Sequence, residues 1–575
     1  MKLRFRSRKN ARQKTSTYFK NDILKKASCL SIIILILLTI MPSGIILGQL
    51  SSGGLPASTL YSLPSDDRNV ISVNRPDMDV IRNEDEKFAS PYRFAVILPV
   101  DISPESSGKW EQAPDGGRIW RVSVSVPGAH ALSAYFDRFV LPEGGKVFFY
   151  NPSKTQVIGA FTSRNNVTGG YFATELIAGE RFIMEYSQPS GARVAPLIHM
   201  YSIDFAYRGV GFLDSYGDVE NPTGACEVNV RCPEGDSWFY QERGVTRIKI
   251  RKNGNSYWCT GSLLNNARNN FVPYMLTADH CLSGATAADL QQWIFYFNFE
   301  SPTCTTVTPS YSNTMTGATL KAHGGDSGDT GSDFCLVLLN QNIPDTFNVY
   351  FNGWNRKDTT SPSGVGIHHP EGDLKKISTY DKPLVTVNYY ANPNPCHWKV
   401  SWIATPNGHG VTEPGSSGSP LFDKYGRVVG TLTGGDSSCD PGNLDSPDYY
   451  GKFSWSWDKN GADSTVRLKD WLDPDNMGIQ NMEGLPLGIP GLSKNFTIKL
   501  SPNPFTDKIR IEVEGRNGQT AEIEVLNLMG ITLWSGMTSF GSSPVSFSFP
   551  GLSSGLYFLR ITFPGSVSTV KMIRQ

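Results

Sequence analysis

The alternation of apolar and polar positions predicts β-strands along most of the chain. Residues 120–126 alternate for seven positions, which is the period of a strand with one buried face. Shorter strand-like runs, separated by Gly and Pro turns, occur at 146–150, 181–186, 247–250, 334–339, 509–513 and 521–526. Helical periodicity is scarce, and the clearest helix spans 464–472, where an Asp-Pro pair ends it. We therefore predict an all-β protein.

A basic and then apolar segment opens the chain. Ten Lys and Arg residues precede an apolar run from Leu30 to Met41, which Pro42 and Gly44 interrupt. This order is typical of a signal peptide, here residues 1–48, that directs export. The run is shorter than the roughly 20 residues of a membrane helix, although Ile45–Leu47 could extend it into an uncleaved anchor. The following residues, up to about 90, lack periodicity and are expected to be a flexible leader.

The cysteines indicate an oxidising compartment. One of the nine, Cys29, lies in the signal peptide, and the other eight lie in one segment, at positions 226, 232, 259, 281, 304, 335, 396 and 439. An even number in an exported chain predicts four disulfides. Zinc binding is the competing interpretation, but the chain has neither a Cys-x-x-Cys pair nor a His-Glu-x-x-His motif.

Composition divides the exported part of the chain into separate regions. The cysteine-free strands between about 90 and 205 predict a β-sandwich that is distinct from the cysteine-rich domain after it. Pro486, Gly488, Pro490 and Gly491 then form a linker. The predicted regions after the signal peptide are 49–215, 216–485, the linker 486–495 and a last domain at 496–575. Lys plus Arg equals Asp plus Glu, 53 each, so no overall field favours nucleic acid.

Two short motifs carry candidate chemistry. Residues 415–420 are Gly-Ser-Ser-Gly-Ser-Pro, and residues 276–281 are Leu-Thr-Ala-Asp-His-Cys. Acyl transfer through a nucleophile needs a serine, a histidine base, an acid that orients the base, and backbone donors for the oxyanion. Ser417 and His280 fit the first two roles. The N–H groups of Gly415 and Ser417 can converge on the oxyanion because glycines surround the serine.

The orienting acid is expected between His280 and Ser417. Asp326, Asp329 and Asp333 cluster in a Gly-rich stretch, and only Asp333 directly precedes an apolar strand. The order His, Asp, Ser is that of chymotrypsin-like proteases, whereas α/β-hydrolases have the order Ser, Asp, His. We therefore predict a double β-barrel. The adjacent His368 and His369 are interpreted as structural, because neighbouring side chains of a strand point to opposite faces. Likewise, a buried structural histidine is the alternative for His280.

The cysteine-rich domain resembles the bacterial lysyl endopeptidase family, from about Gly224 to Gly484. Two features depart from trypsin itself: Val411 lies six positions before Ser417, where trypsins have an Asp, and Ser416 directly precedes the serine. The resemblance rests on Cys226-x5-Cys232-Pro-Glu-Gly-Asp, Cys259-Thr-Gly-Ser-Leu, Ser332-Asp-Phe, Ile367-His-His-Pro, Val411-Thr-Glu-Pro and Trp471-Leu-Asp-Pro.

This resemblance implies site residues and disulfide pairs. The implied triad is His280, Asp333 and Ser417, and the acid that binds the substrate ammonium is Asp448, in Asp-Tyr-Tyr-Gly. Lysyl members carry a His where this chain has Thr433, so arginine stays open as a second specificity. The implied disulfide bridges are Cys226–Cys439, Cys232–Cys304 and Cys259–Cys281, and Cys335 and Cys396, which lie outside the pattern, are expected to form a fourth.

The last domain resembles the C-terminal sorting domain of the type IX secretion system of Bacteroidetes. The resemblance rests on Ser501-Pro-Asn-Pro-Phe, two alternating strands, Gly555-Leu-Tyr-Phe-Leu-Arg and the basic end Lys571-Met-Ile-Arg. It implies a β-sandwich that the secretion machinery recognises. A carbohydrate-binding β-sandwich is the alternative.

Together, these features predict a secreted serine endopeptidase that cleaves after Lys, or also after Arg, and is made as a zymogen. The resemblance implies that residues 49–215 are a pro-region, which we hypothesise assists folding and blocks the site. We expect protein or peptide substrates, release to the medium or the cell surface, no nucleic-acid partner, no cofactor or metal, and a monomeric mature enzyme. Two other hypotheses stay open: a surface adhesin on a protease scaffold, and an esterase, which would leave Asp448 unexplained.

Overall fold

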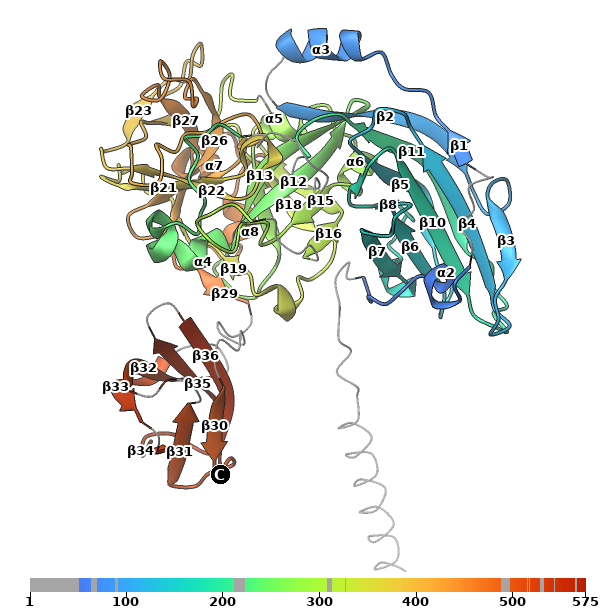
Figure 1. Cartoon of the computed structure of the whole chain (residues 1–575). Coiled ribbons are helices and arrows are strands. Elements are labelled where there is room, and N and C mark those ends of the chain that lie inside the picture. Colours follow the sequence, from blue (N-terminus) through green and yellow to red (C-terminus); the bar gives the residue numbers. More distant parts are fainter. Residues whose placement is uncertain are drawn as a thin grey trace, which may run out of the picture. The chain divides into compact units, whose positions relative to one another are not determined.

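Figure 1 shows the fold, a computed structural model in which strands predominate. The structure describes residues 51–63, 70–87, 91–210, 223–307, 313–325, 327–487, 497–513, 516, 518–527, 532–541, 543–563 and 566–575. The prediction of an all-β protein is confirmed. The signal peptide and Asp326 lie outside the described residues.

The region from 70 to 206 is a β-sandwich with its own core. One sheet has the order β1 (Val70–Ser72), β4 (Arg118–Ser125), β10 (Arg181–Gln188), β6 (Lys146–Tyr150) and β7 (Val157–Phe161), with β3 (Lys109–Gln112) beside β4. The facing strands are β2 (Tyr92–Ile102), β11 (Leu197–Ala206), β5 (Ala131–Val140), β8 (Phe172–Ala173) and β9 (Ile177–Ala178). Phenylalanine rings fill the space between the sheets, among them Phe136, Phe139, Phe149 and Phe172.

Part of the expected flexible leader is regular structure, which corrects that prediction. Helix α3 (Met78–Lys87) follows Asp77, whose carboxylate accepts a hydrogen bond from the N–H of Asp79 at 3.0 Å. Met78 and Ile81 lie on one helix face and pack into the sandwich core. Strand β1 pairs in parallel with β4. Two apolar positions three residues apart were too short a pattern to predict this helix.

The sandwich and the cysteine-rich domain share one sheet, since β2 pairs antiparallel with β13 (Asn255–Leu264). Beside this ladder, the Lys249 ammonium lies 2.8 Å from the carboxylate of Asp204, and both side chains are fully buried. The hydroxyls of Ser133, Tyr135 and Ser256 also donate to Asp204. Asp204 belongs to the sandwich and Lys249 to the cysteine-rich domain. Because separating the two regions would leave each buried charge without its partner, this pair stabilises their association.

The first half of the cysteine-rich domain is a barrel-like sheet around one core. Its strands are β12 (Val245–Lys252), β13, β14 (Tyr274–Thr277), β15 (Ile294–Tyr296), β16 (Thr314–Thr316), β17 (Ala318–His323) and β18 (Cys335–Leu339). Ile248, Leu263, Met275, Phe295 and Val337 lie in its core. The edge of this half carries the short helices α5 (Asp279–Leu282) and α6 (Ala287–Leu290).

The second half has a separate sheet, which completes the predicted double barrel. It contains β20 (Trp354–Asn355), β21 (Gly364–His368), β22 (Lys376–Tyr380), β23 (Val385–Val387), β24 (His397–Val400), β25 (Pro420–Asp423), β26 (Val428–Gly435), β27 (Asp448–Lys452) and β28 (Asn481–Met482). The helix predicted at 464–472 is interrupted, because Arg467 is extended between a 3-10 turn, Ser464–Val466, and α8 (Lys469–Leu472).

Three disulfides cross-link the cysteine-rich domain: Cys226–Cys439, Cys232–Cys304 and Cys259–Cys281. The expected fourth bridge is not formed, so that prediction is wrong for Cys335 and Cys396, which keep their thiols. Cys335 is the first residue of β18 and packs in the core of the first half. The Cys396 thiol instead donates to the carbonyl of Gly331 at 3.0 Å.

The C-terminal domain is the predicted β-sandwich. One sheet holds β30 (Ile498–Ser501), β31 (Lys508–Val513) and β34 (Val545–Ser548), and the other holds β33 (Thr532–Phe540), β32 (Gln519–Leu526), β35 (Gly555–Phe563) and β36 (Ser566–Arg574). Alternate residues of the central strands form its core, including Ile509, Ile511, Ile523 and Val525. Among the described residues, no helix has the length and apolar character needed to cross a membrane.

Candidate active site

Strand pairing brings His280 and Asp333 together. In the β14–β18 ladder Thr277 lies opposite Cys335, so the residues just after β14 and just before β18 meet at one edge. His280 Nδ1 lies 2.7 Å from Asp333 Oδ2, and the main-chain N–H of His280 donates to Asp333 Oδ1 at 2.9 Å. The carboxylate thus holds both the ring and the backbone of the histidine. Burial raises the pKa of Asp333 above its usual value, while the charge and hydrogen bonds of His280 oppose that shift.

The loop of Ser417 is fixed against the first barrel. The N–H of Thr260 donates to the Ser417 carbonyl at 2.8 Å, and its hydroxyl donates to the Gly415 carbonyl at 3.0 Å. Gly418 has a φ of +83°, and a Cβ there would lie 2.2 Å from Thr277 Oγ1. Thr260 follows Cys259, which is bonded to Cys281, the neighbour of His280. The serine loop therefore packs directly on the elements that present the histidine.

Two main-chain N–H groups of this loop have no acceptor among the described residues. The amides of Ser416, Gly418 and Ser419 donate to the carbonyls of Glu413, Leu432 and Ser416. In contrast, no described group accepts a hydrogen bond from the N–H of Gly415 or of Ser417. Gly415 has a φ of +102°, and a Cβ there would meet the main-chain nitrogen of Glu371 at 2.7 Å. The two donors predicted from the sequence are thus the ones that the loop leaves unused.

The structure does not join Ser417 and His280 by a hydrogen bond. Ser417 is 4% exposed, and its hydroxyl makes no hydrogen bond with any described group. His280 Nε2 is buried and has no hydrogen-bond partner among the described residues. The Sγ atom of Cys281, the residue after His280, lies 3.9 Å from the Ser417 carbonyl oxygen. The imidazole nitrogen opposite Asp333 is therefore available to a proton donor.

Asp448 is fully buried and held by three side chains from distant parts of the domain. Its Oδ2 accepts from Trp402 Nε1 at 2.6 Å, from the Thr412 hydroxyl at 2.7 Å and from the Ser437 hydroxyl at 2.6 Å. Within the described part of the chain, its Oδ1 accepts only the N–H of Ser437, at 3.3 Å. Burial raises the pKa of Asp448, and these hydrogen bonds counteract the shift. Gly435 lies opposite Asp448 in the β26–β27 ladder, and a Cβ there would be 2.0 Å from Oδ1.

The two adjacent histidines are both buried, and one of them supports the serine loop. His368 Nδ1 lies 2.9 Å from the hydroxyl of Ser416, and Nε2 lies 2.9 Å from the hydroxyl of Ser378. Burial lowers the pKa of His368 to about 3, so the ring stays neutral in ordinary buffers. His369 Nδ1 bonds to the carbonyl of Asp373. Their separate partners agree with the structural interpretation of this pair.

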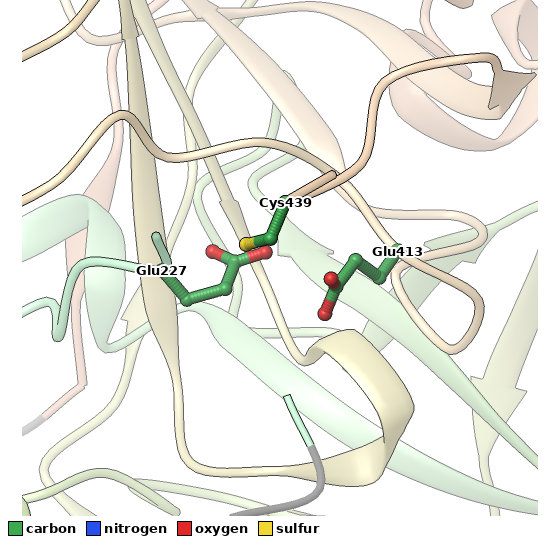
Figure 2. Close-up of side chains that lie close together, drawn as sticks. All are labelled: Glu227, Glu413 and Cys439. Carbon is green, nitrogen blue, oxygen red and sulfur yellow. The ribbon is translucent and has the colours of Figure 1, made fainter. Parts of the chain in front are cut away.

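Figure 2 shows a further cluster, Glu227, Glu413 and Cys439, whose candidate ligand atoms lie within 4.8 Å of one another. The sulfur belongs to the bridge with Cys226, so it offers no thiolate. Two carboxylates remain, fewer than the ligand sets of structural zinc or calcium. Both oxygens of Glu227 are buried and have no hydrogen-bond partner in the part of the chain that the structure describes. Burial and the charge of Glu413 raise the pKa of Glu227 well above its usual value.

Glu227→Gln is expected to stabilise the protein at pH 8 and to have little effect near pH 5. A carboxyl group whose folded pKa is raised stabilises the fold below its unfolded pKa, and this stability is lost as pH rises through the folded pKa. The glutamine amide does not ionise, so the variant does not lose this stability as pH rises. We expect thermal unfolding at pH 8 to show a higher Tm, by about 2–4 °C for a gain of ~1 kcal/mol in the free energy of unfolding. Glu143→Gln, at an exposed turn, is the control, and equal destabilisation by Glu227→Gln at both pH values would contradict the expectation.

Sequence reasoning missed several residues of this site. Trp402 carries no local signal, because its indole reaches Asp448 only through the fold. Thr412 belongs to the quoted Val411-Thr-Glu-Pro run, and Ser437 lies shortly after Thr433, but their hydroxyls could not be assigned a target. Thr260 directly follows a bridged cysteine and was quoted only as part of a motif.

Two parts of the chain match models of known protein families. Residues 221–451 match the family model described as lysyl endopeptidase, C-terminal domain. Residues 499–575 match that of the secretion system C-terminal sorting domain. A lysyl endopeptidase of Pseudomonas aeruginosa is 28% identical over 366 residues, which cover 60% of this chain and 75% of that protein. Karilysin of Tannerella forsythia is 34% identical over 102 residues, which cover 15% of this chain and 21% of karilysin.

Solved structures of proteases also align with the chain. Protease Anisep from Arthrobacter nicotinovorans covers 37% of this chain and 90% of its own length, at 19% identity and a TM-score of 0.27. A Glu endopeptidase aligns over 41% of this chain and 94% of its own length, at 16% identity and a TM-score of 0.25. The fold assignment rests on the two barrel sheets described above.

Proposed function

We propose that this chain, a secreted serine endopeptidase of the lysyl endopeptidase family with a type IX sorting domain, hydrolyses peptide bonds that follow lysine. The observation that carries the proposal is the buried Asp448 carboxylate, which has one oxygen saturated by three donors and the other still open. The sorting domain directs the enzyme to the cell surface or the medium, and we propose that the secretion machinery binds it.

The proposed chemistry is acyl transfer through a covalent intermediate. Ser417 Oγ attacks the scissile carbonyl carbon, His280 Nε2 takes the hydroxyl proton, and Asp333 holds the ring through Nδ1. The tetrahedral oxyanion receives the N–H groups of Gly415 and Ser417. His280 then gives its proton to the leaving amine, and water repeats the sequence on the ester to release the acid. The support is the short Asp333–His280 contact, the two unused amides and the orphaned Nε2 atom.

The proposed preference for lysine depends on the hydrogen bonds that the protein already makes to the Asp448 carboxylate. A carboxylate offers about four acceptor positions. Three donors occupy Oδ2, and Oδ1 has one long contact. An ammonium group can use this single remaining oxygen, whereas a guanidinium makes its best contact with both oxygens of a carboxylate at once. Arginine should therefore bind with a poorer geometry in the same pocket.

Matched peptide amides that differ only in Lys or Arg before the scissile bond test this proposal. We expect kcat/KM to be about 10- to 100-fold higher for lysine, because the arginine side chain loses its second hydrogen bond. The measurement uses purified mature enzyme, with a norleucine peptide as the uncharged control. Equal rates for lysine and arginine would refute the single-oxygen argument. Acetate esters cleaved while lysyl amides stay intact would favour an esterase.

A further inference from the structure

A buried lysine contacts the main chain of the candidate catalytic histidine. Lys252 is the last residue of β12 and is 5% exposed. Its ammonium donates to the carbonyl oxygen of His280 at 2.6 Å, and among the described residues it makes no other hydrogen bond. An ammonium group offers three donors, and burying it with so few partners costs free energy. A lysine kept in such a place needs an explanation beyond packing.

The turn that carries Lys252 is in close contact with the loop after His280. Asn253 and Gly254 connect β12 to β13, and a Cβ at Gly284 would lie 2.1 Å from Asn253 Nδ2. The Cys259–Cys281 bridge joins the same hairpin to the residue that directly follows His280. The backbone at His280 is therefore held at two points, by the disulfide and by the lysine.

The charged groups around Lys252 belong to the candidate active site. The carboxylates of Asp333 and Asp279 both attract its ammonium. Asp279 in turn contacts His323 Nδ1 at 2.7 Å and accepts the N–H of Ser327 at 3.0 Å. On the β13 side, the Tyr257 ring centroid lies 5.2 Å from Lys252 Nζ. The lysine thus acts as a counter-ion for the buried Asp333.

We propose that Lys252 is a positioning residue. Its ammonium holds the His280 main chain, so that the imidazole stays between Asp333 and the Ser417 hydroxyl. This inference rests on the proposed function of the triad. The lysine does not touch the substrate. Its charge fixes the carbonyl of the histidine and balances Asp333, and loss of that charge lets the turn shift.

The direction of the pH dependence follows from the burial of the group. Burial lowers the pKa of Lys252 to about 8, so the ammonium is lost as pH rises through this value, and activity is expected to fall there. Burial raises the pKa of both Tyr257 and Cys335, so these groups keep their protons in that window. The substrate lysine, with an ordinary pKa of about 10.4, also stays charged.

Stability should respond in the opposite direction. A lysine whose folded pKa is depressed releases its proton in the folded protein before it does so in the unfolded chain. Between about pH 8 and the unfolded pKa near 10.4, the unfolded chain binds more protons, so the contribution of Lys252 to stability rises with pH. Deprotonation of Lys252 is therefore expected to lower activity over the same pH range in which this group increases the free energy of unfolding. A loss of activity caused by unfolding would instead accompany a loss of stability.

The test is the pH profile of kcat/KM from pH 6.5 to 9.5 with the lysyl peptide amide, for the full mature enzyme and three variants. Wild type is expected to lose about tenfold between pH 7 and 9.5. Lys252→Met should lie about 10- to 100-fold lower at pH 7, in kcat more than in KM, and should lack the fall near pH 8. Lys252→Arg, which keeps its charge, should move the fall to higher pH. Lys424→Met, on an exposed turn, should match wild type.

Distinct outcomes separate this inference from the proposed function. If wild type cuts the lysyl peptide and Lys252→Met keeps both the rate and the fall near pH 8, the positioning role is wrong while the triad stands. If wild type cuts no lysyl peptide after removal of the pro-region, the proposed function itself fails. Thermal unfolding of each variant at pH 7 verifies the fold, and Lys252→Arg provides the comparison if Lys252→Met does not fold.

Discussion

Replacing Ser417 by alanine is expected to lower kcat for a lysyl peptide amide by about 10⁶-fold, because no other described hydroxyl is placed to form the acyl-enzyme. The His280 and Asp333 contact should survive, since neither residue bonds to the Ser417 hydroxyl. KM should change little, because Asp448 still binds the lysine. The measurement is single-turnover kinetics on purified Ser417→Ala, with an ester substrate added to detect acyl-enzyme accumulation in wild type.

Ser416→Ala is the matched control for this change. Its hydroxyl contacts His368 rather than the proposed reaction path, so its loss should cost less than about tenfold in kcat. A loss with Ser416→Ala as large as that with Ser417→Ala would remove the assignment of the nucleophile. If wild type and Ser417→Ala bind lysyl peptides equally well and neither turns them over, a binding module on a protease scaffold becomes the better interpretation.

The second large effect is expected from Asp448→Asn, which should lower kcat/KM for the lysyl peptide by about 10⁴-fold. The amide keeps the size of the side chain, but it carries no charge for the ammonium and presents an NH₂ group toward donors that need an acceptor. Burying the substrate cation without its counter-ion then carries a penalty of several kcal/mol. Turnover of the norleucine peptide should fall far less, because that side chain brings no charge into the pocket.

Asp445→Asn is the control, since this aspartate lies three residues earlier and its side chain is 99% exposed. Its replacement should leave kcat/KM within about twofold, because exposed charges contribute little. A strong loss in Asp445→Asn together with normal activity in Asp448→Asn would move the specificity site to the exposed residue. Equal losses with the lysine and norleucine peptides in Asp448→Asn would indicate a packing defect instead.

The sequence was sufficient for those parts of the site that lie next to regular strands. His280 and Asp333 each flank a short apolar strand, and antiparallel pairing of these strands places the two residues at one edge. The serine motif could be recognised because a turn of this kind needs positive φ angles, which glycine adopts readily; Gly415 and Gly418 both have them. The all-β fold was readable from period-two patterns, and the strands at 146–150 and 509–513 agree with β6 and β31.

Contacts that depend on chain packing could not be read in the same way. The donors to Asp448 come from positions 402, 412 and 437, which have no common local pattern, and Lys252 lies 28 residues before His280. The prediction of a fourth disulfide was wrong for a related reason. The even number of cysteines carries no information that Cys335 lies in the first barrel and Cys396 in the second. The helix at 78–87 was missed because only two of its residues face the core.

The β2–β13 ladder means that the sandwich at 70–206 and the cysteine-rich domain are separate in sequence but share one sheet. Hydrolysis of the backbone between them would give two polypeptides that still share one sheet and the buried Lys249–Asp204 pair. Such fragments would resemble a complemented split protein, whose pieces separate only when the shared contacts open together. Cutting the chain and separating the sandwich from the cysteine-rich domain would then be two different events.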